Sequence, residues 1–279
     1  MEFTRSLNQI LIMVLLALAI PCAAQDDAQA GETAHLQGEA RELADWLIAG
    51  LRAGFEDLDF ETFEALWAED AQRVWARSQR AGERDIVFDA ESLIPTYRII
   101  FGGQDAGVRA RYFRVVVVID GDRAMAQWQV EISTEISDYR EVISEQTHLR
   151  RDADGNWRIT HVRAWMERTF MDGGWVALTQ NEWSRRDRQA QRAAEADDPY
   201  EYVFALMDAY RMPEAHEILV GITEQPDAEA IDWSLRGYTA TLAGIPDDVY
   251  PCFERAREMD PDVWLPHFAI PREPDAAAE

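Results

Sequence analysis

Asp154-Gly155-Asn156-Trp157-Arg158-Ile159-Thr160-His161 closes the stretch that decides the fold, residues 112–166, in which extended segments alternate with tight turns. Side chains of a β-strand point alternately to its two faces, and residues 123–134 place apolar side chains on one side and mostly polar ones on the other. Asp120-Gly121 and Asp154-Gly155 are strong signals for tight turns between antiparallel strands. The stretch therefore predicts a four-stranded meander with one buried face, its strands at 109–119, 123–134, 139–151 and 157–167.

The residues before this sheet predict three helices and one short strand. Apolar residues recur at helical spacing over 34–53, and Gly54 follows them. Asp59 is expected to cap a second helix, whose apolar side consists of Phe60, Phe63, Leu66 and Trp67. Residues 84–88 can form a short strand, and a third helix is expected over 89–101 with a kink at Pro95. Three helices followed by a curved antiparallel sheet predict an α+β cone.

Two segments of this region resemble one known superfamily. Residues 58–71 (LDFETFEALWAEDA) resemble the early signature of NTF2-like proteins, also called SnoaL-like or ketosteroid-isomerase-like, and residues 154–161 resemble their closing strand. The resemblance covers residues 36–168 and implies the cone fold. Proteins of this fold include enzymes, binding proteins and assembly domains, so the resemblance alone does not assign an activity.

The residues after the sheet predict helices. Thr179 with Glu182, and Asp198 with Glu201, have the spacing of capping boxes that start helices near Gln180 and Pro199. A further helix starts at Pro213, and residues 230–243 and 248–259 form a helical hairpin. The spacing of one set of residues in the last hairpin resembles a tetratricopeptide (TPR) repeat: Trp233, Gly237, Gly244, Phe253, Ala256 and Pro261. Ala240 and Val249 depart from that pattern, and residues 200–226 resemble a degenerate copy.

This organisation gives six segments: a signal peptide at 1–24, a flexible leader at 25–33, the NTF2-like domain at 34–170, a linker with a connecting helix at 171–198, TPR-like hairpins at 199–265, and an acidic disordered tail at 266–279. The apolar run at 10–20 is too short for a comfortable membrane span, so no transmembrane segment is expected after cleavage. The resulting location is periplasmic or secreted, with a lipid anchor on Cys22 as the less favoured alternative. Cys252 then remains as a buried, unreactive thiol.

Charge and composition exclude several functions. The formal net charge is −25, which argues against binding nucleic acid or an anionic membrane surface. All 27 basic residues are arginine, which excludes a Schiff-base or P-loop lysine. The histidines have no metal-ligand spacing and no cofactor motif occurs, so neither a metal nor a cofactor is expected.

The candidate site depends on the last strand. By alternation, Trp157, Ile159, His161, Arg163 and Trp165 share one side. If that side is concave, His161 and Arg163 project into a pocket with Trp128, Trp165 and Glu145, and Tyr97 adds a donor. The resemblance implies an isomerase, cyclase or dehydratase in which His161 is the base and Arg163 or Tyr97 stabilises negative charge.

A structural alternative places His161 in a core network, pairs Arg163 with Glu145 and leaves His148 on the surface. The catalytic residues of the family's enzymes cannot be matched one by one to this chain. The sequence therefore favours a non-catalytic exported protein that binds a small ligand, a protein partner through its helices, or both. The sheet could also form a homodimer.

Overall fold

The computed structural model describes residues 32–77, 82, 85–102, 108–134, 140–171, 173–196, 198–266 and 269, and these form two compact units. A sheet unit contains the described residues from 32 to 94 and from 108 to 177. A helical unit contains residues 95–102 and those from 178 onward. The signal peptide, most of the leader and nearly all of the acidic tail lie outside the described residues.

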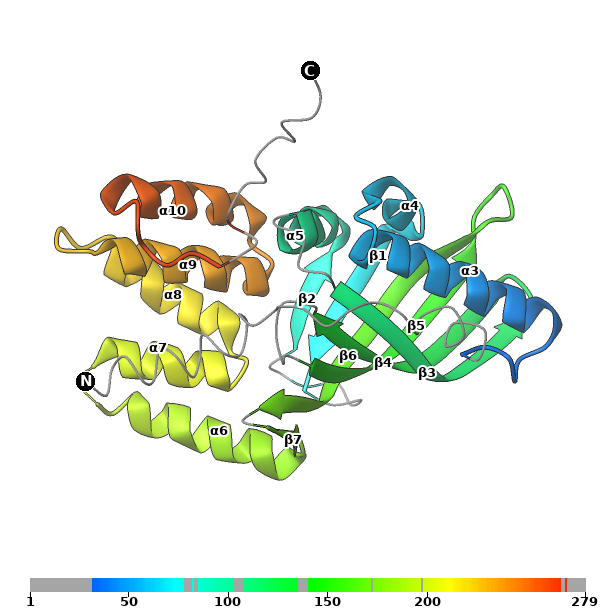
Figure 1. Cartoon of the computed structure of the whole chain (residues 1–279), viewed down its shortest axis with the longest axis horizontal. Coiled ribbons are helices and arrows are strands. Elements are labelled where there is room, and N and C mark those ends of the chain that lie inside the picture. Colours follow the sequence, from blue (N-terminus) through cyan, green and yellow to red (C-terminus); the bar gives the residue numbers. More distant parts are fainter. Residues whose placement is uncertain are drawn as a thin grey trace, which may run out of the picture. The chain divides into compact units, whose positions relative to one another are not determined.

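The sheet unit is built on a mixed, largely antiparallel sheet (Figure 1). Within the described residues it has seven strands: β1 (Trp67–Ala76), β2 (Ile86–Asp89), β3 (Val108–Asp120), β4 (Arg123–Thr134), β5 (Arg140–Arg151), β6 (Trp157–Met171) and β7 (Gly174–Ala177). The order is β2-β1-β6-β5-β4-β3, with β7 paired to β6. The meander β3–β6 is the one predicted, and its turns contain Gly121 and Gly155 at positive φ, a conformation that glycine adopts without strain.

Helix α3 (Gly38–Phe55) covers one face of this sheet (Figure 1). Its Arg52 donates hydrogen bonds to the carbonyl oxygen of Ala110 on β3, and the guanidinium lies 5.5 Å from the centre of the Tyr112 ring. Helix α4 (Phe60–Glu64) packs on α3, where Phe63 lies against Gly54 so closely that a Cβ atom there would meet its ring at 2.6 Å. We call the sheet face that contains Tyr112 the inner face and the opposite one the outer face.

Two sequence predictions about this unit were wrong. The second helix ends at Glu64, and Trp67 opens strand β1 instead of continuing the helix. Strand β1 pairs parallel with β6, so its pairing partner lies far away in the sequence and leaves no local signal. The segment after the sheet also begins with a strand, β7, where a linker was expected. The third helix, α5 (Ala90–Gly102), and strand β2 agree with prediction.

The helical unit contains α6 (Gln180–Ala193), α7 (Pro199–Asp208), α8 (Met212–Thr223), α9 (Ala230–Ala243) and α10 (Pro246–Met259). Thr179 and Asp198 cap α6 and α7 as predicted, because their side chains accept hydrogen bonds from backbone N–H groups of the first turn. Helices α9 and α10 pack at Gly237, where a Cβ atom would lie 2.7 Å from the buried Phe253 ring. Each helix from α6 to α9 packs on the next one in the chain.

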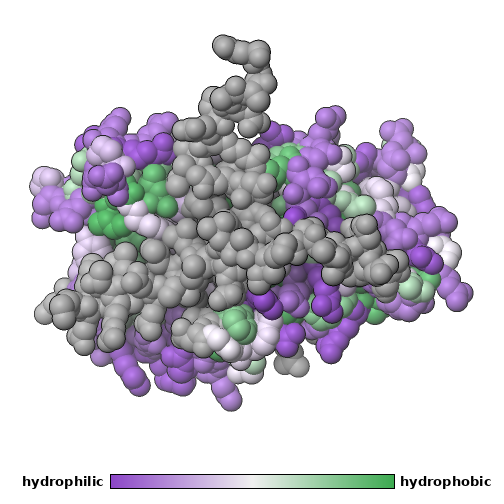
Figure 2. Space-filling view, viewed as in Figure 1, coloured by the Kyte–Doolittle hydropathy of each residue, from purple (hydrophilic) through white to green (hydrophobic). Residues whose placement is uncertain are grey.

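Hydrophilic residues predominate on the described surface drawn in Figure 2, in keeping with the acidic composition. Among the described residues, no helix is both long enough and apolar enough to cross a membrane.

Candidate functional site

A β-bulge in strand β6 decides which side chains share a face. His161 pairs with His148, but the next pair toward the turn is Ile159 with Leu149, so β6 contains one extra residue there. The extra residue reverses the alternation, because two residues of β6 then oppose one residue of β5. The prediction that Trp157 and Ile159 share a side with His161 was therefore wrong.

The two sets of predicted site residues lie on opposite faces. Trp128 and Glu145 are paired across β4 and β5 on the inner face. The other set consists of His161, Arg163 and Trp165. On β5 these residues pair with the residues that alternate with Glu145, so their side chains lie on the outer face. The predicted pocket that combined both sets is therefore not formed by the sheet.

The inner face contains a buried polar cluster around Glu145. Its carboxylate pairs with the guanidinium of Arg73 from β1, and both side chains are only 9% exposed. The second carboxylate oxygen accepts a hydrogen bond of 3.0 Å from the indole nitrogen of Trp128. Both oxygens of Glu145 are thus occupied by donors from neighbouring strands, and the expected pair of Glu145 with Arg163 was wrong.

Tyr112 lies beside this cluster. Its ring centre is 5.8 Å from that of Trp128 in an edge-to-face arrangement. Burial, reinforced by the nearby negative charge of Glu145, raises the pKa of the Tyr112 hydroxyl well above its ordinary value. Tyr112 is therefore a neutral phenol at physiological pH.

Arg73 is the inner-face residue that the sequence interpretation missed. It lies on β1, the strand that was taken for the end of a helix. A carboxylate on the buried face of a strand requires a cationic or hydrogen-bonding partner, so the need for a residue such as Arg73 could have been anticipated, although its position could not.

The outer face contains His161 and its neighbours. The ring centres of His161 and His148 lie 6.0 Å apart, and His148 is exposed as predicted. Burial, followed by the nearby His148 and the positive Arg163, lowers the pKa of His161, which favours its neutral form. Arg163 pairs with Asp85 at 2.8 Å. Trp165 is buried on this face and donates a 2.8 Å hydrogen bond to Glu167.

Tyr97, the remaining candidate, lies on α5 and is 9% exposed. Its position belongs to the helical unit, whereas His161 and Arg163 belong to the sheet unit. The structure therefore does not bring the three catalytic candidates together in one unit.

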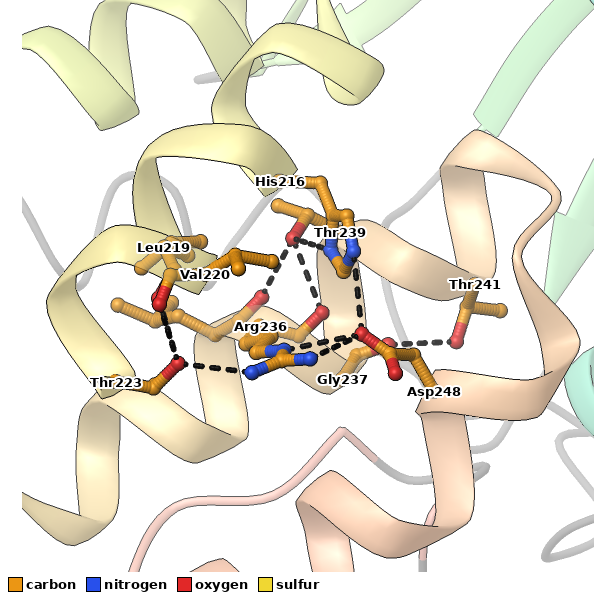
Figure 3. A network of polar contacts seen from close by, with 10 residues as sticks. His216, Leu219, Val220, Thr223, Arg236, Gly237, Thr239, Thr241 and Asp248 are labelled. Carbon is orange, nitrogen blue, oxygen red and sulfur yellow. Dashed lines mark hydrogen bonds and ion pairs between the residues drawn. The ribbon is translucent and has the colours of Figure 1, made fainter.

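A second polar cluster ties three helices of the helical unit together (Figure 3). Arg236 of α9 binds Asp248 of α10 at 2.6 Å and donates a 3.0 Å hydrogen bond to Thr223 of α8. His216 of α8 lies 3.3 Å from the same Asp248 oxygen, and its other ring nitrogen is 3.4 Å from the Thr239 hydroxyl. Burial lowers the pKa of His216, although Asp248 opposes this effect. Every polar group in this cluster has a partner, which is typical of a structural network.

The described residues also bear on the possible metal ligands and on the thiol of Cys252. Across the described part of the chain, no group of three or more histidine, cysteine, aspartate or glutamate side chains could hold a metal ion. Cys252 is buried, and this burial raises the pKa of its thiol to about 11. A thiol that is neutral and buried is a poor nucleophile, as expected.

The fold thus defines an α+β sheet unit joined to a helical unit. No protein-family model and no curated protein matches the chain. Solved structures that resemble it include an NTF2-like protein of unknown function from Pseudomonas putida KT2440, with 16% identity and a TM-score of 0.39, covering 45% of this chain and 84% of that one. An NTF2-like protein from Cytophaga hutchinsonii ATCC 33406 has 16% identity and a TM-score of 0.37, covering 47% and 99%.

A ketosteroid isomerase-like protein from Erwinia carotovora atroseptica SCRI1043 has 18% identity and a TM-score of 0.34, covering 47% and 98%. At these scores the likenesses assign neither a family nor an activity to the chain.

Proposed function

We propose that the chain is an exported, non-catalytic binding protein in which an NTF2-like sheet domain is followed by a TPR-like module that engages a protein partner. The observation that carries this proposal is the state of Glu145, whose two oxygens are taken by Arg73 and Trp128. A general base must be free to accept a proton from a substrate, and both oxygens of this carboxylate already accept hydrogen bonds from neighbouring strands.

The geometry does not favour the enzymatic alternative. An isomerase, cyclase or dehydratase with His161 as its base would need His161 beside the aromatic side chains of the inner face. The bulge in β6 places His161 on the outer face instead. On the inner face the carboxylate beside the Tyr112 phenol is that of Glu145, and both of its oxygens already accept hydrogen bonds from Arg73 and Trp128.

Three sequence features support the rest of the proposal. The segments 58–71 and 154–161 resemble NTF2-like signatures, and the spacing of residues 233–261 resembles a TPR repeat. In the helical unit Gly237 packs directly on Phe253, which is the small-against-large contact that such a repeat uses. The apolar segment 10–20 with small residues after it supports export.

Site-specific photo-crosslinking tests the proposal in cells of the source organism. A crosslinking residue would replace Tyr250, which is 50% exposed on α10, and the matched control would replace Val118, which is 54% exposed on the sheet. We expect one discrete crosslinked protein at position 250 and none at position 118. Equal labelling of many proteins at both positions, or turnover of a small molecule that is lost in Glu145→Gln but not in His161→Ala, would contradict the proposal.

A further inference from the structure

Two histidines face each other on the outer surface of the sheet unit. His148 on β5 is the direct cross-strand partner of His161 on β6, and their ring centres are 6.0 Å apart at an interplanar angle of 56°. His148 is exposed and His161 is half-buried, so solvent reaches the pair. The bulge in β6 creates this arrangement, which neither histidine's sequence spacing reveals.

The separation of the rings is compatible with a shared metal ion. A metal–imidazole nitrogen bond is about 2.0–2.1 Å long, so two imidazoles on one ion have ring centres at most roughly 6.4 Å apart. The observed 6.0 Å lies within that limit. Rotation of the exposed His148 side chain can bring its ring nitrogen toward an ion on His161 without moving the backbone, because exposed side chains change rotamer readily.

A thioether extends the row of potential ligands. Met125 on β4 is the direct cross-strand partner of His148, so Met125, His148 and His161 occupy three adjacent strands at one level of the sheet. Directly opposite side chains on such strands have Cβ atoms about 4.5–5.5 Å apart. The sulfur of Met125 accepts a 3.1 Å hydrogen bond from the amide of Gln146 on the same face, which orients its polar atom over the outer surface.

The surrounding charges decide which ion this row suits. Arg163 is two residues from His161, and Asp85 neutralises it at 2.8 Å. The row itself contains two imidazoles, one thioether and no carboxylate, so it offers little to magnesium or calcium, which prefer oxygen ligands. Imidazole suits zinc, copper and nickel, whereas a thioether selects Cu(I).

We propose that Met125, His148 and His161 form a binding site for a single copper ion, in the Cu(I) state, on the outer face of the sheet. All three side chains belong to the sheet unit and lie on the face opposite the inner-face cluster. It gives the chain a second capacity, the binding of a soft metal, beside the partner binding proposed above.

Competition with a chromophoric Cu(I) chelator under anaerobic reducing conditions measures the affinity of the protein for Cu(I). The full chain would be used with Cys22→Ser, because a cysteine thiolate would bind the same soft ion. We expect saturable binding of one Cu(I), with affinity at least ten-fold lower in His148→Ala and in His161→Ala. His35→Ala is the matched control, since His35 is an exposed histidine whose ring is hydrogen-bonded elsewhere, to the Val115 carbonyl oxygen. It should bind like the parent protein.

Met125→Leu separates this ligand set from an ordinary pair of histidines. The substitution keeps the side-chain volume but removes the sulfur, so Cu(I) affinity should fall at least ten-fold whereas weak Zn²⁺ binding should not change. Parent-like Cu(I) binding by the His148→Ala/His161→Ala double variant, or by Met125→Leu, would overturn the proposal.

A measurement on the parent protein avoids any folding defect of the variants. Ag(I), a diamagnetic substitute for Cu(I), should shift the ring resonances of His148 and His161 in the NMR spectrum and leave those of His35 in place. Uniform small shifts of all histidines would overturn the site.

Discussion

Replacing Glu145 by glutamine removes the negative charge from the inner-face cluster and breaks the buried ion pair with Arg73. Both side chains of the pair are 9% exposed, so solvent cannot take the place of the carboxylate. Breaking a buried ion pair by removing one partner costs about 3–5 kcal/mol. Glu145→Gln should lower the free energy of unfolding by roughly this amount.

Urea denaturation followed by intrinsic tryptophan fluorescence measures the effect, with the slope m compared between variants to confirm that the same surface unfolds. The double variant Arg73→Met/Glu145→Leu provides the matched control, because it replaces both charges with apolar side chains of similar volume. Such replacements are often neutral or stabilising by about 1–4 kcal/mol. The double variant should therefore recover most of the stability that the single variant loses.

A loss below about 1 kcal/mol in Glu145→Gln would refute this reasoning. It would mean that Arg73 does not depend on Glu145 in the folded protein. The carboxylate would then be available to a ligand or a substrate proton, and the main support for a non-catalytic inner face would be removed.

Three further changes test the helical unit. Gly237→Ala should destabilise the protein by about 1–3 kcal/mol in urea denaturation, because its Cβ would meet the Phe253 ring at 2.7 Å. Gly221→Ala is the control: its Cβ would have open space, so it should stabilise α8 by up to about 1 kcal/mol. Equal effects of the two variants would contradict the packing of Gly237 on Phe253. Thr179→Ala removes the N-cap of α6 and should cost about 0.5–2 kcal/mol in thermal unfolding monitored by circular dichroism, and Thr179→Ser should restore it. The folded-state pKa of His216 is lowered, so the unfolded chain takes up a proton first and stability falls as pH drops below about 6.5. His216→Gln should flatten the decrease in stability between about pH 7 and 5, and an unchanged pH profile would show that His216 does not contribute to it.

Local signals were sufficient for most elements of the fold. The strand alternation of 123–134 and the turns at Gly121 and Gly155 describe pairings between neighbours in the sequence, so the β3–β6 meander could be predicted. The caps at Thr179 and Asp198 act within one helical turn, and both were identified correctly. The sequence therefore predicts those elements whose stabilising contacts are short in range.

The rest depends on long-range contacts. Strand β1 has the alanine and acidic residues of a helix and becomes a strand only because β6 and β2 pair with it. The bulge at His161 is a property of two paired strands, and one extra residue was enough to put Trp157 and Ile159 on the opposite face from His161. Both candidate sites were affected. The predicted pocket does not form, because its residues lie on two faces, and the pairing of His148 with His161 could not be predicted from the sequence.

The parallel pairing of β1 with β6 also determines the order in which the sheet can be completed. The meander β3–β6 consists of strands that are neighbours in the sequence and can form as soon as it leaves the ribosome. Strand β1 precedes the meander in the chain and can pair early with its neighbour β2, but it cannot pair with β6 until that last strand of the meander exists. The edge of β1 that pairs with β6 stays open during that interval, and an open strand edge is a site where another chain can pair.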